Sequence, residues 1–205
     1  MKPACAFDEA PLDHIPSENL SAVLGLRNTT IAAKLASSCL LRPAVNHKIL
    51  SELPALPGEL PQATALLCAD LLTKDAEKLA DLCRITTIMI NHKVILCTTS
   101  GAVLRDIASW CGEQALLLSL AEKRFPAFKN MQVLNVASRD LLEIYKQKVE
   151  GLLLGFLPPA YLERLKLQLK PGELSEPVAF APDDPDKECF LRYAALAREY
   201  SDARI

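Results

Sequence analysis

Cysteine and histidine are the residue types of this sequence with the greatest capacity for chemistry. Seven cysteines occur, at positions 5, 39, 68, 83, 97, 111 and 189, and no two lie within ten residues of each other. Because the chain contains no CxxC pair, zinc ribbons and thioredoxin-like redox motifs are excluded. The odd number and wide spacing predict reduced thiols that pack as small apolar side chains in a cytosolic protein.

A metal site or an activated nucleophile would require histidine beside these thiols. One grouping could bind a metal ion: His92 with Cys83, Cys97 and Cys111. A polar turn residue near buried thiols accounts for this grouping better, and no local pattern supports a cysteine–histidine nucleophile. We therefore predict no catalytic residue, no metal and no cofactor, and keep a small cysteine-dependent enzyme as an alternative.

An acidic run near the C-terminus resembles a cation-binding loop: Asp183, Asp184, Asp186 and Glu188. It lacks the alternation with glycine that a calcium loop needs, so a solvated loop leading into a helix cap accounts for it better. Phosphate-binding glycine loops, the GxSxG elbow and the HExxH zinc motif do not occur in the sequence. The residues thus favour an interaction protein over an enzyme.

Composition indicates what must position these residues. Of the 205 residues, 50% are hydrophobic but only 5% are aromatic, which predicts packed helices with an aliphatic core. The net charge of -2 and the pI of about 6.0 argue against a nucleic-acid binder and a polybasic membrane-surface protein. We find no signal-peptide pattern and no apolar run long enough to span a bilayer. The sequence predicts a cytoplasmic protein without direct membrane insertion.

We predict a mainly α fold over residues 1–205, as a single compact multi-helix domain with at most a short β element near 165–170, where LKLQLK alternates. The predicted segments are an irregular N-terminal arm (1–20), a proline-rich turn (53–61), a central helical core (62–128), a long amphipathic helix (136–157), an acidic proline-rich loop (171–185) and a C-terminal helix (185–200).

Local signals place the helix ends and leave one segment ambiguous. The predicted N-caps are Ser17, Asn28, Thr73, either Thr99 or Ser100, Ser138 and Asp184. Pro43 is expected to end a helix, and Lys146 to pair with Glu150 at i,i+4. Residues 85–98 fit either a helix or a β-hairpin around a polar turn. We favour the helix because the apolar residues run continuously and the flanking sequence is helical.

The N-terminal arm resembles the opening of the SctK family, the cytoplasmic sorting-platform adaptors of bacterial type III secretion systems. The residues that carry the likeness are Phe7, Pro11, His14, Ile15, Pro16 and Leu20. Later stretches resemble the family in the same order: Leu66–Leu72, Ala76–Leu79, Gly112-Glu113, Gly151–Pro158 and Arg164–Pro171. Together these stretches extend over about 150 residues.

The resemblance implies a non-catalytic adaptor for protein export. Its partners would be the cytoplasmic domain of the inner-membrane ring protein and the C-ring (pod) protein of the sorting platform. It would lie at the inner membrane through protein contacts alone. The candidate partner-binding residues are Phe7, Pro11, Leu12, His14, Ile15 and Pro16. A helical chaperone or regulatory protein-binding module is the main alternative.

Overall fold

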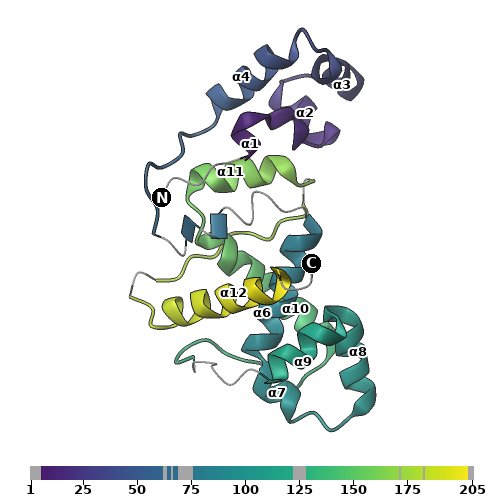
Figure 1. Ribbon diagram of the computed structural model, residues 1–205, viewed down its shortest axis with the longest axis vertical. Helices are drawn as coiled ribbons and strands as arrows, with labels where there is room; N and C mark the ends of the chain where they lie inside the picture. Colours follow the sequence, from purple (N-terminus) through teal and green to yellow (C-terminus); the bar gives the residue numbers. More distant parts are fainter. Residues whose placement is uncertain are drawn as a thin grey trace. The chain divides into compact units, whose positions relative to one another are not determined.

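The computed structural model describes residues 6–61, 64–65, 67–68, 76–121, 128–170, 172–181 and 183–202. Within these ranges the chain is helical and contains no β-strand (Figure 1). The predicted mainly α fold is confirmed. No helix in these ranges combines the length and apolarity needed to cross a membrane.

The chain divides into two compact units, each assembled from two separate stretches. Unit 1 comprises Met1–Ala76 with Phe156–Leu174, and unit 2 comprises Glu77–Gly155 with Ser175–Ile205. A unit that combines distant stretches depends on contacts that local periodicity cannot specify. The prediction of a single domain stays a prediction, and each unit is described by itself below.

The described part of unit 1 includes the short helical elements α1 (Ala6–Glu9), η1 (Pro11–Asp13), α2 (Ser17–Val23), α3 (Thr29–Ser37), α4 (Arg42–Glu52) and α11 (Pro159–Gln168). The prediction of an irregular arm over residues 1–20 is wrong for its described part, which is largely helical. Its prolines lie where a helix tolerates them, because Pro11 opens η1 and Pro16 is the N-cap residue of α2.

Three local predictions in unit 1 had different outcomes. The Asn28 cap of α3 is confirmed, since its Oδ1 accepts from the backbone N–H groups of Thr30 and Ile31 at 2.9 and 3.3 Å. The Ser17 cap is wrong, because Ser17 is already the first residue of α2. Pro43 does not end a helix but stands in the first turn of α4, where its missing N–H costs nothing.

The optional strand near 165–170 does not form, because α11 extends to Gln168. Tyr161, Leu165 and Leu169 are all buried and stand four residues apart. Residues at this spacing share one helix face, so the leucines serve a helical packing surface rather than one face of a strand.

The described helices of unit 2 are α6 (Ala76–Ile90), α7 (His92–Leu96), α8 (Gly101–Cys111), α9 (Glu113–Ala121), α10 (Arg139–Gly155) and α12 (Asp186–Asp202). One cluster of its core is aliphatic with a single tryptophan: Ile88, Ile95, Ile107, Trp110, Cys111, Leu116, Ala137 and Leu142. The described residues within 62–128 are largely helical, but the segment divides between the two units after Ala76, so the predicted central core stays a prediction. Residues 62–63, 66, 69–75 (which include the predicted cap Thr73) and 122–127 lie outside the described ranges.

The ambiguous segment 85–98 is helical, as favoured from the sequence, but it breaks at Asn91 between α6 and α7. The buried Asn91 side chain stabilises this break. Its Nδ2 donates to the Thr87 carbonyl at 2.9 Å, and its Oδ1 accepts from the Leu134 N–H at 2.8 Å. The Asn91 side chain thus bonds to one nearby and one distant backbone group at the break between the two helices. The structure has this helix break where the alternative prediction had a hairpin turn.

The remaining boundaries agree closely with the sequence. Ser100 and Ser138 accept from the N–H groups of Val103 and Leu141, as N-caps do. The long amphipathic helix predicted over 136–157 is α10, and the C-terminal helix predicted over 185–200 is α12. Asp184 accepts from the N–H of Asp186, the first residue of α12, at 2.9 Å.

Candidate partner-binding site

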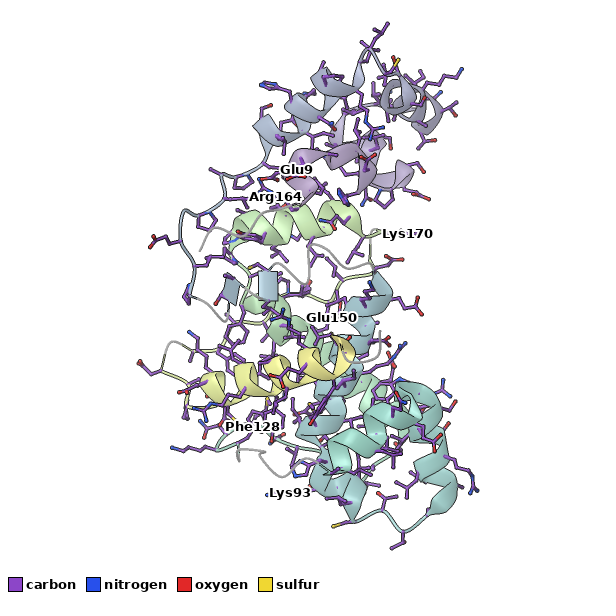
Figure 2. The ribbon with its side chains drawn as sticks, in the orientation of Figure 1. Glu9, Lys93, Phe128, Glu150, Arg164 and Lys170 are labelled. Carbon is purple, nitrogen blue, oxygen red and sulfur yellow. The ribbon has the colours of Figure 1, made fainter. Side chains whose placement is uncertain are left out.

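The arm and α11 of unit 1 are joined by a buried arginine. Arg164 is 3% exposed and points from α11 toward α1 (Figure 2). Its Nε and Nη2 donate to the two carboxylate oxygens of Asp8 at 2.6 and 3.2 Å. Its Nη1 donates to the carbonyls of Pro54 and Ala160 at 3.0 and 2.8 Å. One cation therefore satisfies acceptors from three separate parts of unit 1.

A second polar side chain ties the arm to the C-terminal end of the same helix. Asn19 of α2 is 7% exposed, and its Nδ2 lies 2.9 Å from the Leu167 carbonyl and 2.5 Å from the Leu169 carbonyl. The last carbonyls of a helix have no partner within the helix. The Asn19 amide supplies one, so α2 caps the C-terminus of α11.

The six predicted partner-binding residues belong to this packed arm. Phe7, Pro11 and Ile15 are buried, Phe7 completely. Leu12, His14 and Pro16 are half-buried. The backbone N–H of Leu12 also donates to the Oδ1 of Asn46 at 3.2 Å. The resemblance of the arm thus picked out residues that pack inside unit 1. Of the six, only Leu12, His14 and Pro16 keep exposed surface that a partner could contact.

A buried carboxylate organises one end of unit 2. Asp186 is 1% exposed and accepts from the N–H groups of Lys129, Asn130 and Met131 at 2.5 to 2.6 Å. Burial acts to raise the pKa of this carboxyl, but the three backbone donors and the Lys129 charge outweigh it and lower the pKa below 3.8. Asp186 belongs to the acidic run that resembled a cation-binding loop. Its carboxylate instead binds the backbone of residues 129–131.

We expect Asp186→Asn to lower the free energy of unfolding by about 1.5–3 kcal/mol at neutral pH. The NH₂ group of asparagine would face the backbone N–H groups of residues 129–131, which need an acceptor. Since the pKa is lowered on folding, the carboxylate stabilises fully above the unfolded pKa, and this contribution is lost as the pH falls through the folded pKa. The unfolding curves of wild type and variant should therefore converge below about pH 4 in urea titrations. Asp183→Asn, an exposed neighbour, is the control and should change neither curve.

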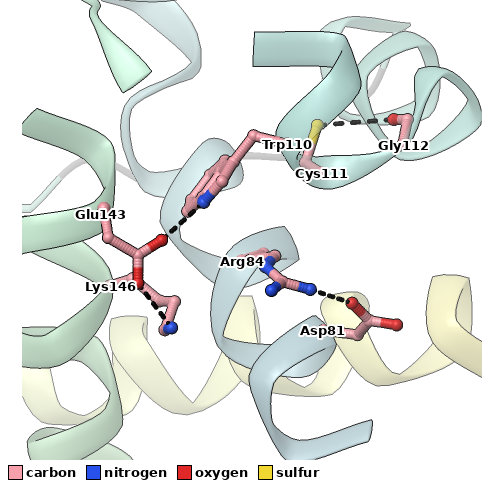
Figure 3. A network of polar contacts seen from close by, with 7 residues as sticks. All are labelled: Asp81, Arg84, Trp110, Cys111, Gly112, Glu143 and Lys146. Carbon is pink, nitrogen blue, oxygen red and sulfur yellow. Dashed lines mark hydrogen bonds and ion pairs between the residues drawn. The ribbon is translucent and has the colours of Figure 1, made fainter. Parts of the chain in front are cut away.

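The single tryptophan of the chain takes part in a polar network on α8 and α10 (Figure 3). Trp110 Nε1 donates to Glu143 Oε2 at 2.6 Å, and Lys146 Nζ lies 2.7 Å from Glu143 Oε1. Burial acts to raise the pKa of Glu143, but the hydrogen bonds from Lys146 and Trp110 lower it overall. The predicted pair between Lys146 and Glu150 is wrong. Lys146 pairs instead with Glu143, which lies one turn earlier on α10 and also accepts the tryptophan hydrogen bond.

Glu150 instead lies inside unit 2 beside a segment that crosses α10. It is 7% exposed, and its Oε1 accepts from the Ser175 N–H at 3.0 Å. One residue on, the Gly151 carbonyl accepts from the Val178 N–H at 2.8 Å. A Cβ at Gly151 would lie 2.7 Å from the Glu176 carbonyl oxygen. The crossing therefore requires the glycine, because real Cβ contacts are never that short.

Burial separates the described cysteines and shifts the pKa of two of them upward. Among the six whose placement is described, Cys68, Cys83 and Cys111 are buried, Cys39 and Cys97 are exposed, and Cys189 is half-buried. Burial, followed by the Glu150 charge, raises the pKa of Cys83, and burial raises that of Cys189 to about 11. A reactive thiol needs the opposite shift. In the described ranges no three metal-ligating side chains gather into a site.

Native alkylation will therefore separate these six thiols by exposure. We expect Cys39 and Cys97 to react first at the rate of an ordinary thiol, and Cys68, Cys83 and Cys111 only when the fold opens. Peptide mass spectrometry after timed maleimide exposure measures this order. A buried cysteine that reacts faster than Cys39 would contradict the expected order and revive the cysteine-dependent enzyme.

The surface of unit 2 that suits a partner is a groove at the end of α7. Its volume is about 520 Å³, and its lining comes from two stretches: Lys93, Val94, Cys97, Thr98, Thr99, Ser100 and Val103 from the first, and Asn135, Val136 and Ala137 from the second. Lys93 and Val94 also line a hollow of about 140 Å³ beside Met131 and Tyr193. We call the larger one the α7 groove.

The α7 groove has the character of a protein-binding surface. Val136 in its lining is 64% exposed, and Leu96, the last residue of α7, is 57% exposed. Its polar members are three hydroxyls, the Cys97 thiol, the Asn135 amide and the Lys93 ammonium (Figure 2). The Ser100 hydroxyl caps α8, and the Thr98 hydroxyl donates to the Val94 carbonyl. Apolar side chains with a few polar groups at the rim are typical of interfaces. No sequence pattern predicts this site, because its two stretches lie more than thirty residues apart.

No match to this chain was found among the protein-family models, the curated proteins or the solved structures.

Proposed function

We propose that this chain is a non-catalytic cytoplasmic adaptor of a bacterial type III secretion system. It links the inner-membrane ring protein to the C-ring (pod) protein of the sorting platform and takes part in protein export. It acts through protein contacts, without a cofactor, nucleic acid or membrane insertion. The proposal rests on the order of the SctK-like stretches along the sequence.

One structural observation supports it above the others. The two ends of the resemblance, the arm with Phe7 and Leu20 and the stretch beginning at Arg164, lie together in unit 1. Asp8 and Arg164 are 156 positions apart and form a buried ion pair, and Asn19 caps the helix that this second stretch forms. Residue patterns that recur together in a family are expected where they pack together, so the two stretches behave as one structural motif.

The α7 groove of unit 2 supplies a surface for one partner. Exposed apolar side chains such as Leu96 and Val136 cost little in the free protein and gain affinity when a partner covers them. The hydroxyls of Thr98 and Thr99 at the same groove can receive polar groups of that partner.

Direct binding tests this proposal. Titration calorimetry of the purified chain with the cytoplasmic domain of the ring protein, and separately with the pod protein, should show saturable binding to both. Val136→Ser should weaken one of the two at least about tenfold. Leu117→Ser, which truncates an equally exposed leucine of α9, is the matched control. Binding to neither protein, together with binding to a secreted substrate, would replace the adaptor by the chaperone alternative.

A further inference from the structure

In unit 1 a short turn joins α3 to α4 (Figure 1). Apolar side chains at this turn are exposed. Leu40 is 87% exposed, and its neighbours Cys39 and Leu41 are also on the surface. On α3, Ile31 is 49% exposed, and Lys34 follows it on the same helix face. We call these five residues the α3–α4 corner.

The corner lies in the longest stretch of the sequence without a carboxylate. Residues 19–51 contain four cationic side chains, Arg27, Lys34, Arg42 and Lys48, and no aspartate or glutamate. The chain as a whole carries a net charge of -2. The apolar corner is therefore set in positive charge on a protein that is otherwise acidic, which favours a partner with carboxylates.

Two of the four cations already have partners inside unit 1. Arg42 pairs with Asp13, and Lys48 pairs with Glu52 at 2.5 Å. Arg27 and Lys34 are exposed, and no ion pair joins either of them to another described residue. These two are the cations available to an incoming ligand.

The numbers favour a protein partner over a lipid surface. Attraction to an anionic membrane amounts to about 1 kcal/mol for each nearby Lys or Arg. Two free cations with two leucines would give only weak, reversible membrane binding, since even one long acyl chain anchors marginally. A protein can place a carboxylate directly beside Lys34 and cover Leu40 with apolar side chains, and a single enclosed anchor can dominate an interface.

We propose that the α3–α4 corner docks an acidic segment of a protein partner, with apolar side chains of that segment covering Leu40 and its carboxylates facing Lys34 and Arg27. This inference concerns a surface of unit 1 and does not depend on the secretion role or on the α7 groove. The partner is recognised by two features together: Asp or Glu side chains and exposed leucine-like or aromatic side chains close to them.

A displayed library of random peptides provides the probe. The full chain is the bait, and the double variant Leu40→Ser/Lys34→Glu is used for counter-selection, so that only peptides specific for the corner remain. The retained peptides should be rich in Asp and Glu and should carry apolar residues. Synthetic copies should bind wild type at least about tenfold more tightly than either single variant. Their affinity should also fall as salt is added.

Matched controls come from unit 2, and all the altered side chains are exposed, so the fold is not at risk. Leu117→Ser and Lys187→Glu should leave the affinity unchanged. Retained peptides that are neutral or basic, or an empty selection, would overturn the proposal. It would equally be overturned if Leu40→Ser abolished binding to phosphatidylserine vesicles while no peptide bound. Loss of self-association in that variant, seen by sedimentation, would assign the corner to a second copy instead.

Discussion

Replacing Arg164 by methionine will lower the free energy of unfolding of unit 1 by about 1.5–3 kcal/mol, because it removes the charged donor shared by the half-buried Asp8 carboxylate and two backbone carbonyls. Methionine keeps much of the length of the side chain but none of its donors. The Asp8 carboxylate, 30% exposed, would lose its only ion-pair partner in the described structure, and the Pro54 carbonyl would lose its arginine donor. A loss of this size is a large part of the stability of an ordinary domain.

Urea unfolding followed by circular dichroism measures this loss. Trp110 lies in unit 2, so its fluorescence shows whether the second unit unfolds together with the first. Arg192→Met is the matched control, because Arg192 pairs with Glu188 on the surface, where a pair contributes at most about 1 kcal/mol.

A double variant distinguishes the loss of the Arg164–Asp8 ion pair from the cost of leaving the Asp8 carboxylate without its partner. Asp8→Asn combined with Arg164→Met removes the carboxylate along with the cation, and it should be less unstable than Arg164→Met alone. An Arg164→Met protein as stable as Arg192→Met would show that the buried pair does not hold the arm to α11.

Gly155→Ala will detach the segment that crosses α10 and lower the stability of unit 2 by about 1–3 kcal/mol, the usual cost of forcing extra atoms into a packed core. A Cβ at Gly155 would lie 2.7 Å from the Val178 carbonyl carbon and nearer still to its oxygen. The obstacle is backbone, so it cannot rotate away as a flexible side chain would. The hydrogen bond from Val178 N–H to the Gly151 carbonyl should be lost with it.

Limited proteolysis within residues 172–181, together with urea unfolding followed by Trp110 fluorescence, measures this effect. The variant should be cleaved faster in that segment than wild type. Gly101→Ala is the control, since the nearest atom to its added Cβ is Arg105 Nη1 at 3.6 Å, an ordinary contact. Alanine is favoured over glycine in helices by about 1 kcal/mol. An increase in stability for Gly155→Ala would therefore contradict the close crossing.

Most of the α3–α4 and α7 surfaces could not be anticipated from the sequence. Leu40 looks like any leucine in a hydrophobic stretch, and only its placement at a turn exposes it. The α7 groove combines residues 93–103 with residues 135–137. Conversely, Phe7 and Ile15 were expected to meet a partner, but the fold buries them. The residue type alone does not say whether an apolar side chain meets its own chain or another.

The all-α class, the preference for a helix over residues 85–98 and most helix ends could be predicted without a structure. Each of these depends on groups within about four residues of one another, such as the Asn28 and Ser100 caps. The partners of the buried polar groups depend on tertiary packing instead. Arg164 meets Asp8, and Asp186 meets the backbone of residues 129–131. Burial removes water as a partner, and the donor or acceptor that replaces it can come from anywhere in the chain.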